Sequence, residues 1–76
     1  MKLSIVGGGA WGTTLGQTLI DNGHEVMIYD VNPAAVEKIN MKKHPFFDTV
    51  LPDQIQATTS LDDIIHFSNY FVLSVP

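Results

Sequence analysis

The chain has 76 residues, of which 45% are hydrophobic and 16% are charged, and its net charge is −4. This composition is typical of one small globular domain, and the acidic balance argues against nucleic acid as a partner. The lack of cysteine excludes disulfide and thiolate chemistry within the chain. Glycines and polar residues interrupt the N-terminal apolar run, so we expect no signal peptide, no membrane span and a cytoplasmic protein.

The first third of the chain predicts a strand, a helix and a second strand. Residues 3–6 are a short apolar run that ends at glycine, as a buried strand does. Residues 10–21 predict a helix, in which Gly12 and Gly16 share one stripe and let the helix backbone lie close to a flat surface. Residues 25–29 predict the second strand.

The rest of the chain repeats this alternation. The expected elements are a helix over residues 34–43, a loop over 46–53, a strand over 54–58, a helix to about residue 67 and a strand over 70–75. Asn32 is expected to cap the first of these helices, with Pro33 in its first turn, and Ser60 is expected to cap the second. Asp62 and Asp63 suit the positive end of that second helix.

The predicted order β-α-β-α-β-α-β indicates an α/β fold. Short connections between alternating strands and helices imply a Rossmann-type parallel sheet with helices on both faces, of which this chain has the first half. In such a doubly wound fold, further strands normally cover the fourth strand. We therefore expect residues 1–76 to be the N-terminal portion of a larger dinucleotide-binding domain, with the catalytic C-terminal domain outside the chain.

Residues 7–12, Gly-Gly-Gly-Ala-Trp-Gly, fit the pattern G-x-G-x-x-G. Gly7 permits a tight turn, Gly9 leaves room for a pyrophosphate, and Gly12 lets the helix pack on the sheet, while the helix N-terminus offers N–H groups to the phosphates. The pattern alone is weak, but a strand precedes it, a helix follows it, and an acid lies 18 residues beyond Gly12. The pattern does not require a glycine at Gly8. The alternative is a glycine-rich turn with no ligand.

That acid, Asp30, follows the second predicted strand. A carboxylate there accepts hydrogen bonds from the hydroxyls of an adenosine ribose and repels a 2′-phosphate, so it favours NAD, with NADP use possible. No arginine or lysine between Asp30 and Glu37 offers a 2′-phosphate a partner. The alternative is a solvated turn aspartate or a helper of the Asn32 cap.

Further candidates lie near the same site. Trp11 either walls the cofactor or substrate site or belongs to a core or interface. Phe46, with Phe47 beside it, either borders the adenine or packs under its loop. The last predicted strand ends at Ser74, Val75 and Pro76, where ligands bind in such folds. We expect the backbone of these residues to contact the cofactor; the alternative is a simple strand end without a ligand.

Metal and acid–base chemistry find little support in the sequence. His24, His44 and His66 lack the spacing of metal ligands and are expected at the surface. No nucleophile and base occur in a catalytic arrangement. We therefore expect no metal site and no catalytic residue in this chain.

Five motifs follow one another along the chain: GxGxWGT at residues 7–13, DNGHEV at 21–26, NP at 32–33, LP and IxATT within 51–59, and LSVP at 73–76. Together they resemble the N-terminal part of the NAD(P)-dependent glycerol-3-phosphate dehydrogenases of bacterial type. The resemblance runs over essentially the whole chain, and its most specific element is the Trp-Gly-Thr of the first motif.

The resemblance implies an oxidoreductase that transfers hydride between NAD(P)H and dihydroxyacetone phosphate, giving sn-glycerol 3-phosphate for phospholipid synthesis. It implies cofactor contacts at Ala10, Trp11, Val31 and Phe46. Family members often carry a small residue in place of Asp30 and an arginine or histidine in place of Val31 or Asn32, and this departure agrees with a preference for NAD. The family's catalytic lysines lie beyond this chain, so we expect the 76-residue piece alone to be inactive.

Two other kinds of function remain open from the residues themselves. The first alternative is a stand-alone, non-catalytic module that pairs through the apolar strand over residues 70–75. The second alternative is part of another reductase of the same fold, of the ketopantoate or 3-hydroxyacyl type. For the enzyme as a whole we expect a homodimer.

Overall fold

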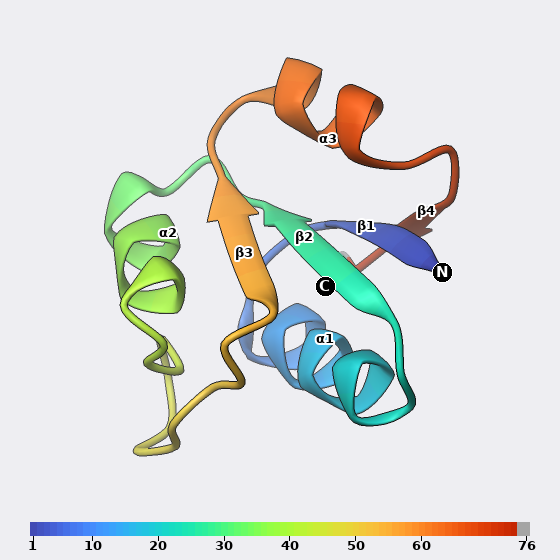
Figure 1. Cartoon of the computed structure of the whole chain (residues 1–76). Helices are drawn as coiled ribbons and strands as arrows, with labels where there is room; N and C mark the ends of the chain where they lie inside the picture. The colour runs from blue at the N-terminus through green and yellow to red at the C-terminus, as the bar shows by residue number, and fades with distance from the viewer. Residues whose placement is uncertain (75–76) are drawn as a thin grey trace.

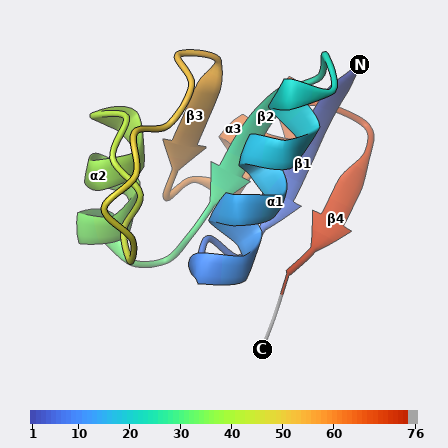
Figure 2. The same ribbon diagram turned by 90° about the horizontal axis from the view of Figure 1, so that it is seen from below.

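The computed structural model describes residues 1–74. Along them lie β1 (Lys2–Val6), α1 (Ala10–Asp21), β2 (Glu25–Tyr29), α2 (Pro33–Asn40), β3 (Ile55–Thr58), α3 (Leu61–Phe67) and β4 (Phe71–Leu73). The strands are parallel and ordered β3-β2-β1-β4 (Figure 1). Helices α1 and α3 cover opposite faces of the sheet, and α2 lies beside β3 (Figure 2). The Rossmann-type parallel sheet with helices on both faces is therefore confirmed.

The core forms where α1 lies on the two inner strands. Ile5 of β1 is in register with Ile28 of β2, and both side chains, with that of Val26, are fully buried. A Cβ added at Gly16 would lie 3.3–3.4 Å from the side chains of these three residues, so the backbone of α1 lies directly on them. The glycine stripe predicted from the sequence thus sets the distance between helix and sheet.

Helix α2 begins as predicted and ends earlier. The Oδ1 atom of Asn32 accepts a hydrogen bond from the N–H of Ala34 at 3.0 Å, and Pro33 occupies the first turn. The helix ends at Asn40, three residues before the predicted end, because Lys42 takes a left-handed conformation with φ of +65°. That conformation reverses the chain toward β3.

Side chains from this reversal bind the outer edge of β3. The side-chain amide of Asn40 accepts from the N–H of Ala57 at 2.9 Å and donates to its carbonyl at 3.0 Å, as a neighbouring strand would. The Nζ of Lys42 donates to the carbonyl of Ile55. Backbone groups of this edge strand therefore have partners although no strand of residues 1–74 pairs with this edge.

The cap of α3 differs from the prediction. Ser60 occupies the N-cap position, but its side chain makes no capping hydrogen bond. Instead Oγ1 of Thr58 accepts from the N–H of Ser60 at 3.0 Å and donates to Oδ2 of Asp63 at 2.6 Å. The hydroxyl that orders this turn thus comes from the end of β3.

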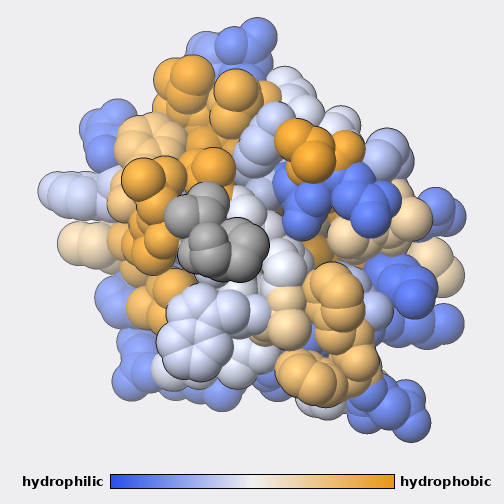
Figure 3. Space-filling model, turned by 180° about the vertical axis from the view of Figure 1, so that it is seen from behind, coloured by the Kyte–Doolittle hydropathy of each residue, from blue (hydrophilic) through white to orange (hydrophobic). Residues whose placement is uncertain are grey.

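Strand β4 is shorter than predicted within the described residues and forms the other edge of the sheet. Phe71 and Leu73 lie two residues apart on one face of β4, and they stay 48% and 73% exposed. Apolar side chains gather on this side of the molecule (Figure 3). Val75 and Pro76 lie outside the described residues.

Candidate functional site

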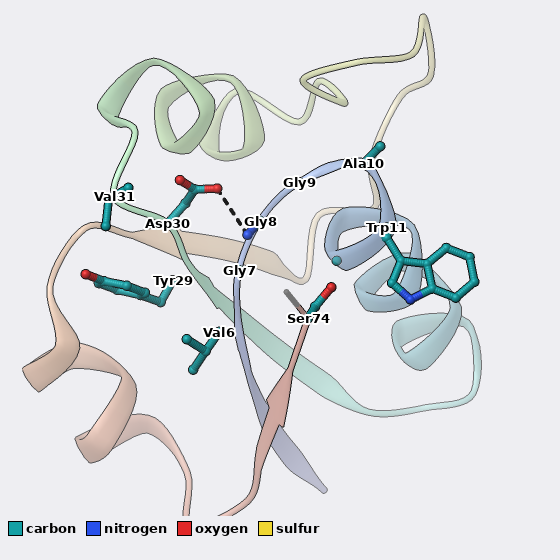
Figure 4. A pocket seen from close by; sticks show the side chains of 11 residues that line it. Val6, Gly7, Gly8, Gly9, Ala10, Trp11, Tyr29, Asp30, Val31 and Ser74 are labelled. Atoms are coloured by element: carbon teal, nitrogen blue, oxygen red, sulfur yellow. Dashed lines mark hydrogen bonds between the residues drawn. The ribbon is translucent and has the colours of Figure 1, made fainter. Parts of the chain in front are cut away.

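A cavity of about 550 Å³ opens at the carboxyl ends of the inner strands, between the turn after β1 and the end of β2 (Figure 4). Its volume lies in the range of cofactor sites, roughly 300–1,000 Å³. Eight of the eleven predicted site residues line it: Gly7, Gly9, Ala10, Trp11, Gly12, Asp30, Val31 and Ser74. The sequence did not point to three further lining residues: Val6, Gly8 and Tyr29.

Two glycines hold the floor of the cavity together. Gly7 has φ of +110°, and its N–H donates to the carbonyl of Tyr29 at 2.9 Å. A Cβ on Gly7 would collide with the carbonyl of Ser74, and one on Gly12 would collide with the carbonyl of Gly7. Only residues without a Cβ allow the turn, helix α1 and the end of β4 to come this close.

Gly9 has a different role, because it faces open space. A Cβ there would meet no protein atom within 4 Å. Gly9 is also the N-cap of α1, which has no side-chain capping bond and no acid in its first turn. The first N–H groups of such a helix are free to bind an anion, and the helix dipole favours negative charge there. The turn therefore has the room and the donors that a phosphate group requires.

Asp30 is held by two backbone N–H groups from different turns. Its Oδ2 accepts from Gly8 at 3.1 Å, and its Oδ1 accepts from Asn32 at 2.9 Å (Figure 4). The contact with Asn32 shows that the carboxylate supports the start of α2, which is the role as a helper of the Asn32 cap that the sequence left open. Each carboxylate oxygen has a second lone pair, so both can accept one more hydrogen bond from a ligand.

Gly8 is more constrained than its position in the motif implied. A Cβ there would lie 2.8 Å from Oδ2 of Asp30 and 3.0 Å from Cγ2 of Ile28. Its carbonyl also accepts a buried hydrogen bond from Oγ1 of Thr13 at 2.8 Å. The motif does not require a glycine at this position, but the surrounding structure does. The cause is a neighbour 22 residues away, which the local pattern does not contain.

Trp11 is not a core residue of the described chain. Its side chain is 77% exposed and stands at the rim of the cavity, in the first turn of α1 (Figure 4). A second, smaller hollow of about 110 Å³ is lined by Trp11 together with Thr14, Leu15 and Thr18. The indole therefore separates the main cavity from the outer surface of the helix.

Phe46 does not line the cavity. Its side chain is 62% exposed, and its N–H and that of Phe47 donate to Nδ1 of His44 at 3.1 and 3.2 Å. Both rings lie against the imidazole, that of Phe47 with its centroid 4.7 Å away. Contact between Phe46 and a cofactor stays a prediction.

His44 itself is buried, with 6% of its surface exposed, so its expected place at the surface was wrong. The ring is enclosed because it accepts the two N–H groups that begin the following loop. Burial lowers the pKa of His44, and a backbone hydrogen bond with Ala10 offsets part of that shift. No signal in the local sequence separates this histidine from an exposed one.

Residues 1–74 contain no cluster of three or more His, Asp or Glu side chains placed to hold a metal ion. No helix among them has the length and apolar character required to cross a membrane.

Comparison with known proteins gives a consistent result. A family model described as "NAD-dependent glycerol-3-phosphate dehydrogenase N-terminus" matches residues 2–76. The chain is 57% identical over 76 residues to a glycerol-3-phosphate dehydrogenase (NAD(P)+) of Acholeplasma laidlawii, and 49% identical over 76 residues to one of Phytoplasma mali. Each match covers 100% of this chain and 23% of the relative.

A more distant relative agrees over a shorter stretch. A glycerol-3-phosphate dehydrogenase (NAD(P)+) of Enterococcus faecalis is 46% identical over 63 residues, which cover 79% of this chain and 18% of the relative. The chain therefore spans about a quarter of the length of the curated relatives that it matches.

Proposed function

The chain belongs to the NAD(P)-dependent glycerol-3-phosphate dehydrogenase family, whose N-terminal part it matches, and from this premise we propose that it opens the cofactor domain of such an enzyme. The complete enzyme transfers hydride between NAD(P)H and dihydroxyacetone phosphate and forms sn-glycerol 3-phosphate for phospholipid synthesis. The observation that carries the proposal is the cavity that joins an uncapped helix N-terminus at Gly9 to a carboxylate at Asp30.

The described residues fit a dinucleotide. The first N–H groups of α1 bind the pyrophosphate, and the open space at Gly9 admits it. Asp30 accepts from the ribose hydroxyls with its remaining lone pairs. When bound, the nicotinamide supplies the hydride; the protein binds the cofactor and orients it. We assign the other contacts to these positions: Ala10, Trp11, Val31, Phe46, Ser74, Val75 and Pro76.

We propose that the enzyme prefers NAD to NADP. The carboxylate of Asp30 would face the 2′-phosphate of NADP, and the negative charges repel each other. Steady-state kinetics of the complete enzyme with NADH and NADPH test this preference, with Asp30→Ser beside wild type. A higher kcat/KM for NADH that Asp30→Ser abolishes supports the assignment. A wild-type preference for NADPH overturns it.

We propose that the groups that bind substrate and move the proton lie in the remaining part of the enzyme. Support comes from the relatives, of which this chain covers only 23%. The reaction is tested by following NADH consumption by the complete protein with dihydroxyacetone phosphate, and separately with ketopantoate and a 3-oxoacyl substrate. Turnover of dihydroxyacetone phosphate alone is expected; turnover of another substrate in its place refutes the proposed reaction.

We further propose that the complete enzyme is a cytoplasmic homodimer. The exposed apolar side chains of β4, Phe71 and Leu73, supply surface that a larger assembly buries. Light scattering of the complete protein tests the dimer. A monomer at high concentration counts against it.

A further inference from the structure

The structure brings Gly8 of the turn into contact with Asp30 at the end of β2. The Gly8 N–H donates to Oδ2 of Asp30 at 3.1 Å, across a separation of 22 residues in sequence. Both residues line the cavity, on the side where Val31 also lies. From this contact we propose that Gly8 is a positioning residue that sets the preference for NAD through Asp30, an inference that rests on the proposed function.

The first part of the argument is steric. A Cβ on Gly8 would lie 2.8 Å from Oδ2 of Asp30 and 3.2 Å from its Cβ, both shorter than ordinary contacts. On the other side it would lie 3.0 Å from Cγ2 of Ile28, whose side chain is fully buried and cannot give way. An alanine would therefore be accommodated by moving the carboxylate of Asp30. Glycine is the residue that lets this carboxylate stay where it is.

The second part concerns the freedom of the carboxylate. Its Oδ2 is bound by Gly8, and its Oδ1 accepts from the N–H of Asn32 at 2.9 Å. One donor belongs to the turn after β1 and the other to the turn after β2, so rotation of the carboxylate breaks at least one bond. Hydrogen bonds to an ionised group are among the stronger ones. The carboxylate is thus ordered before any ligand arrives.

This order has opposite consequences for the two cofactors. A ribose 2′-hydroxyl meets an acceptor already in place, and no side-chain entropy is lost in ordering it. A 2′-phosphate meets a fixed negative charge, which cannot rotate aside to relieve the repulsion. Discrimination between the cofactors therefore depends on the contact with Gly8 as well as on the charge of Asp30.

The test is a double-mutant cycle in the complete enzyme, with dissociation constants for NADH and NADPH measured for wild type, Gly8→Ala, Asp30→Ser and the double variant. We expect Gly8→Ala to weaken NADH binding about tenfold and to weaken NADPH binding less. In the Asp30→Ser background, where there is no carboxylate to displace, the same change should alter the ratio of the two constants little. The cycle also cancels the contact with Ile28, which both backgrounds contain.

Gly9→Ala is the matched control, because a Cβ there reaches no protein atom within 4 Å. It narrows the space for the pyrophosphate that both cofactors share, so it should weaken NADH and NADPH by a similar factor. A Gly8→Ala variant that behaves like this control, or that changes the ratio equally in both backgrounds, overturns the role of Gly8.

A spectroscopic measurement covers the case in which Gly8→Ala does not fold. In wild-type enzyme labelled with ¹⁵N-glycine, the amide proton of Gly8 should resonate downfield because it donates to the carboxylate of Asp30, and it should move upfield in Asp30→Ser. An amide proton of Gly8 with the same chemical shift in wild type and in Asp30→Ser refutes the inference. A wild-type enzyme with no preference for NAD instead refutes the proposed cofactor assignment, whatever Gly8 does, so the two failures are distinct.

Discussion

The Nε2 atom of His44 lies 3.3 Å from Oγ1 of Thr14, and this contact joins the loop after α2 to the second turn of α1. Because Nδ1 accepts from the N–H groups of Phe46 and Phe47, the ring proton resides on Nε2, which donates to the hydroxyl. The pair is therefore a structural link between two elements and not a base beside a nucleophile.

This link makes the fold sensitive to acid. Burial lowers the pKa of His44 below its ordinary value of about 6.5, so the folded protein binds fewer protons than the unfolded one near that pH. The stabilising contribution is complete above about pH 6.5 and is lost as the pH falls toward the lowered pKa. We expect the melting temperature of the complete protein to drop between pH 7.5 and 5.5 in part for this reason.

The control is His44→Asn, which keeps an acceptor near the place of Nδ1 and cannot be protonated in this range. At pH 7.5 the variant should melt at a lower temperature than wild type, because the bond to Thr14 is lost. The difference should shrink at pH 5.5. A constant difference across the range would exclude His44 as the titrating group.

Removal of the amide at the β3 edge should destabilise the protein without touching the cavity. Asn40→Ala leaves the N–H and carbonyl of Ala57 without their partners, at a cost of about 1–3 kcal/mol. The free energy of unfolding in urea measures this. Asn22→Ala is the matched control, since its amide makes one exposed bond, to the carbonyl of Thr18, and its loss should cost less than about 0.5 kcal/mol.

Alanine at Gly12 should lower stability although alanine is the better helix former. Its higher helix propensity contributes up to about 1 kcal/mol, but the Cβ would collide with the carbonyl of Gly7 and press on Oγ of Ser74, 3.0 Å away. Overpacking of this kind costs about 1–3 kcal/mol. Gly16→Ala is the control, because its Cβ contacts are 3.3–3.4 Å and involve only side chains. Urea titration of the two variants should show a larger loss in the free energy of unfolding for Gly12→Ala than for Gly16→Ala.

Trp11→Ala separates a binding role from a folding role. The indole is 77% exposed, so its removal should change the free energy of unfolding by less than about 0.5 kcal/mol. It stands at the rim of the cavity, so the dissociation constant for NADH should rise. Calorimetric titration measures the second effect. Loss of stability with unchanged affinity would assign Trp11 to an interface within the complete enzyme.

The fold could be predicted because its signals are local. The apolar runs, the Asn32 cap with Pro33 in the first helical turn, and the glycines of the turn act over a few residues. The structure confirms the order of elements that they indicate. The end of α2 was wrong because it depends on the left-handed residue Lys42, and no glycine marks that position.

The site was harder to predict where it depends on distant neighbours. The constraint on Gly8 comes from Asp30, and the burial of His44 comes from its bonds to the loop that follows and to α1. Gly8 occupies a position that the G-x-G-x-x-G pattern leaves open, and His44 belongs to no recognisable motif. The side-chain amide of Asn40 likewise binds Ala57, which lies 17 residues further along the chain, and no spacing in the sequence predicts this contact.

The bonds from Asn40 and Lys42 to β3 also bear on aggregation. An exposed strand edge is a template on which extended segments of other chains can add. At β3 that template is already occupied by an amide that mimics a strand and by a lysine, whose charge disfavours stacking. Among the described residues, intermolecular strand addition to this sheet is therefore directed away from the β3 edge and toward the β4 edge.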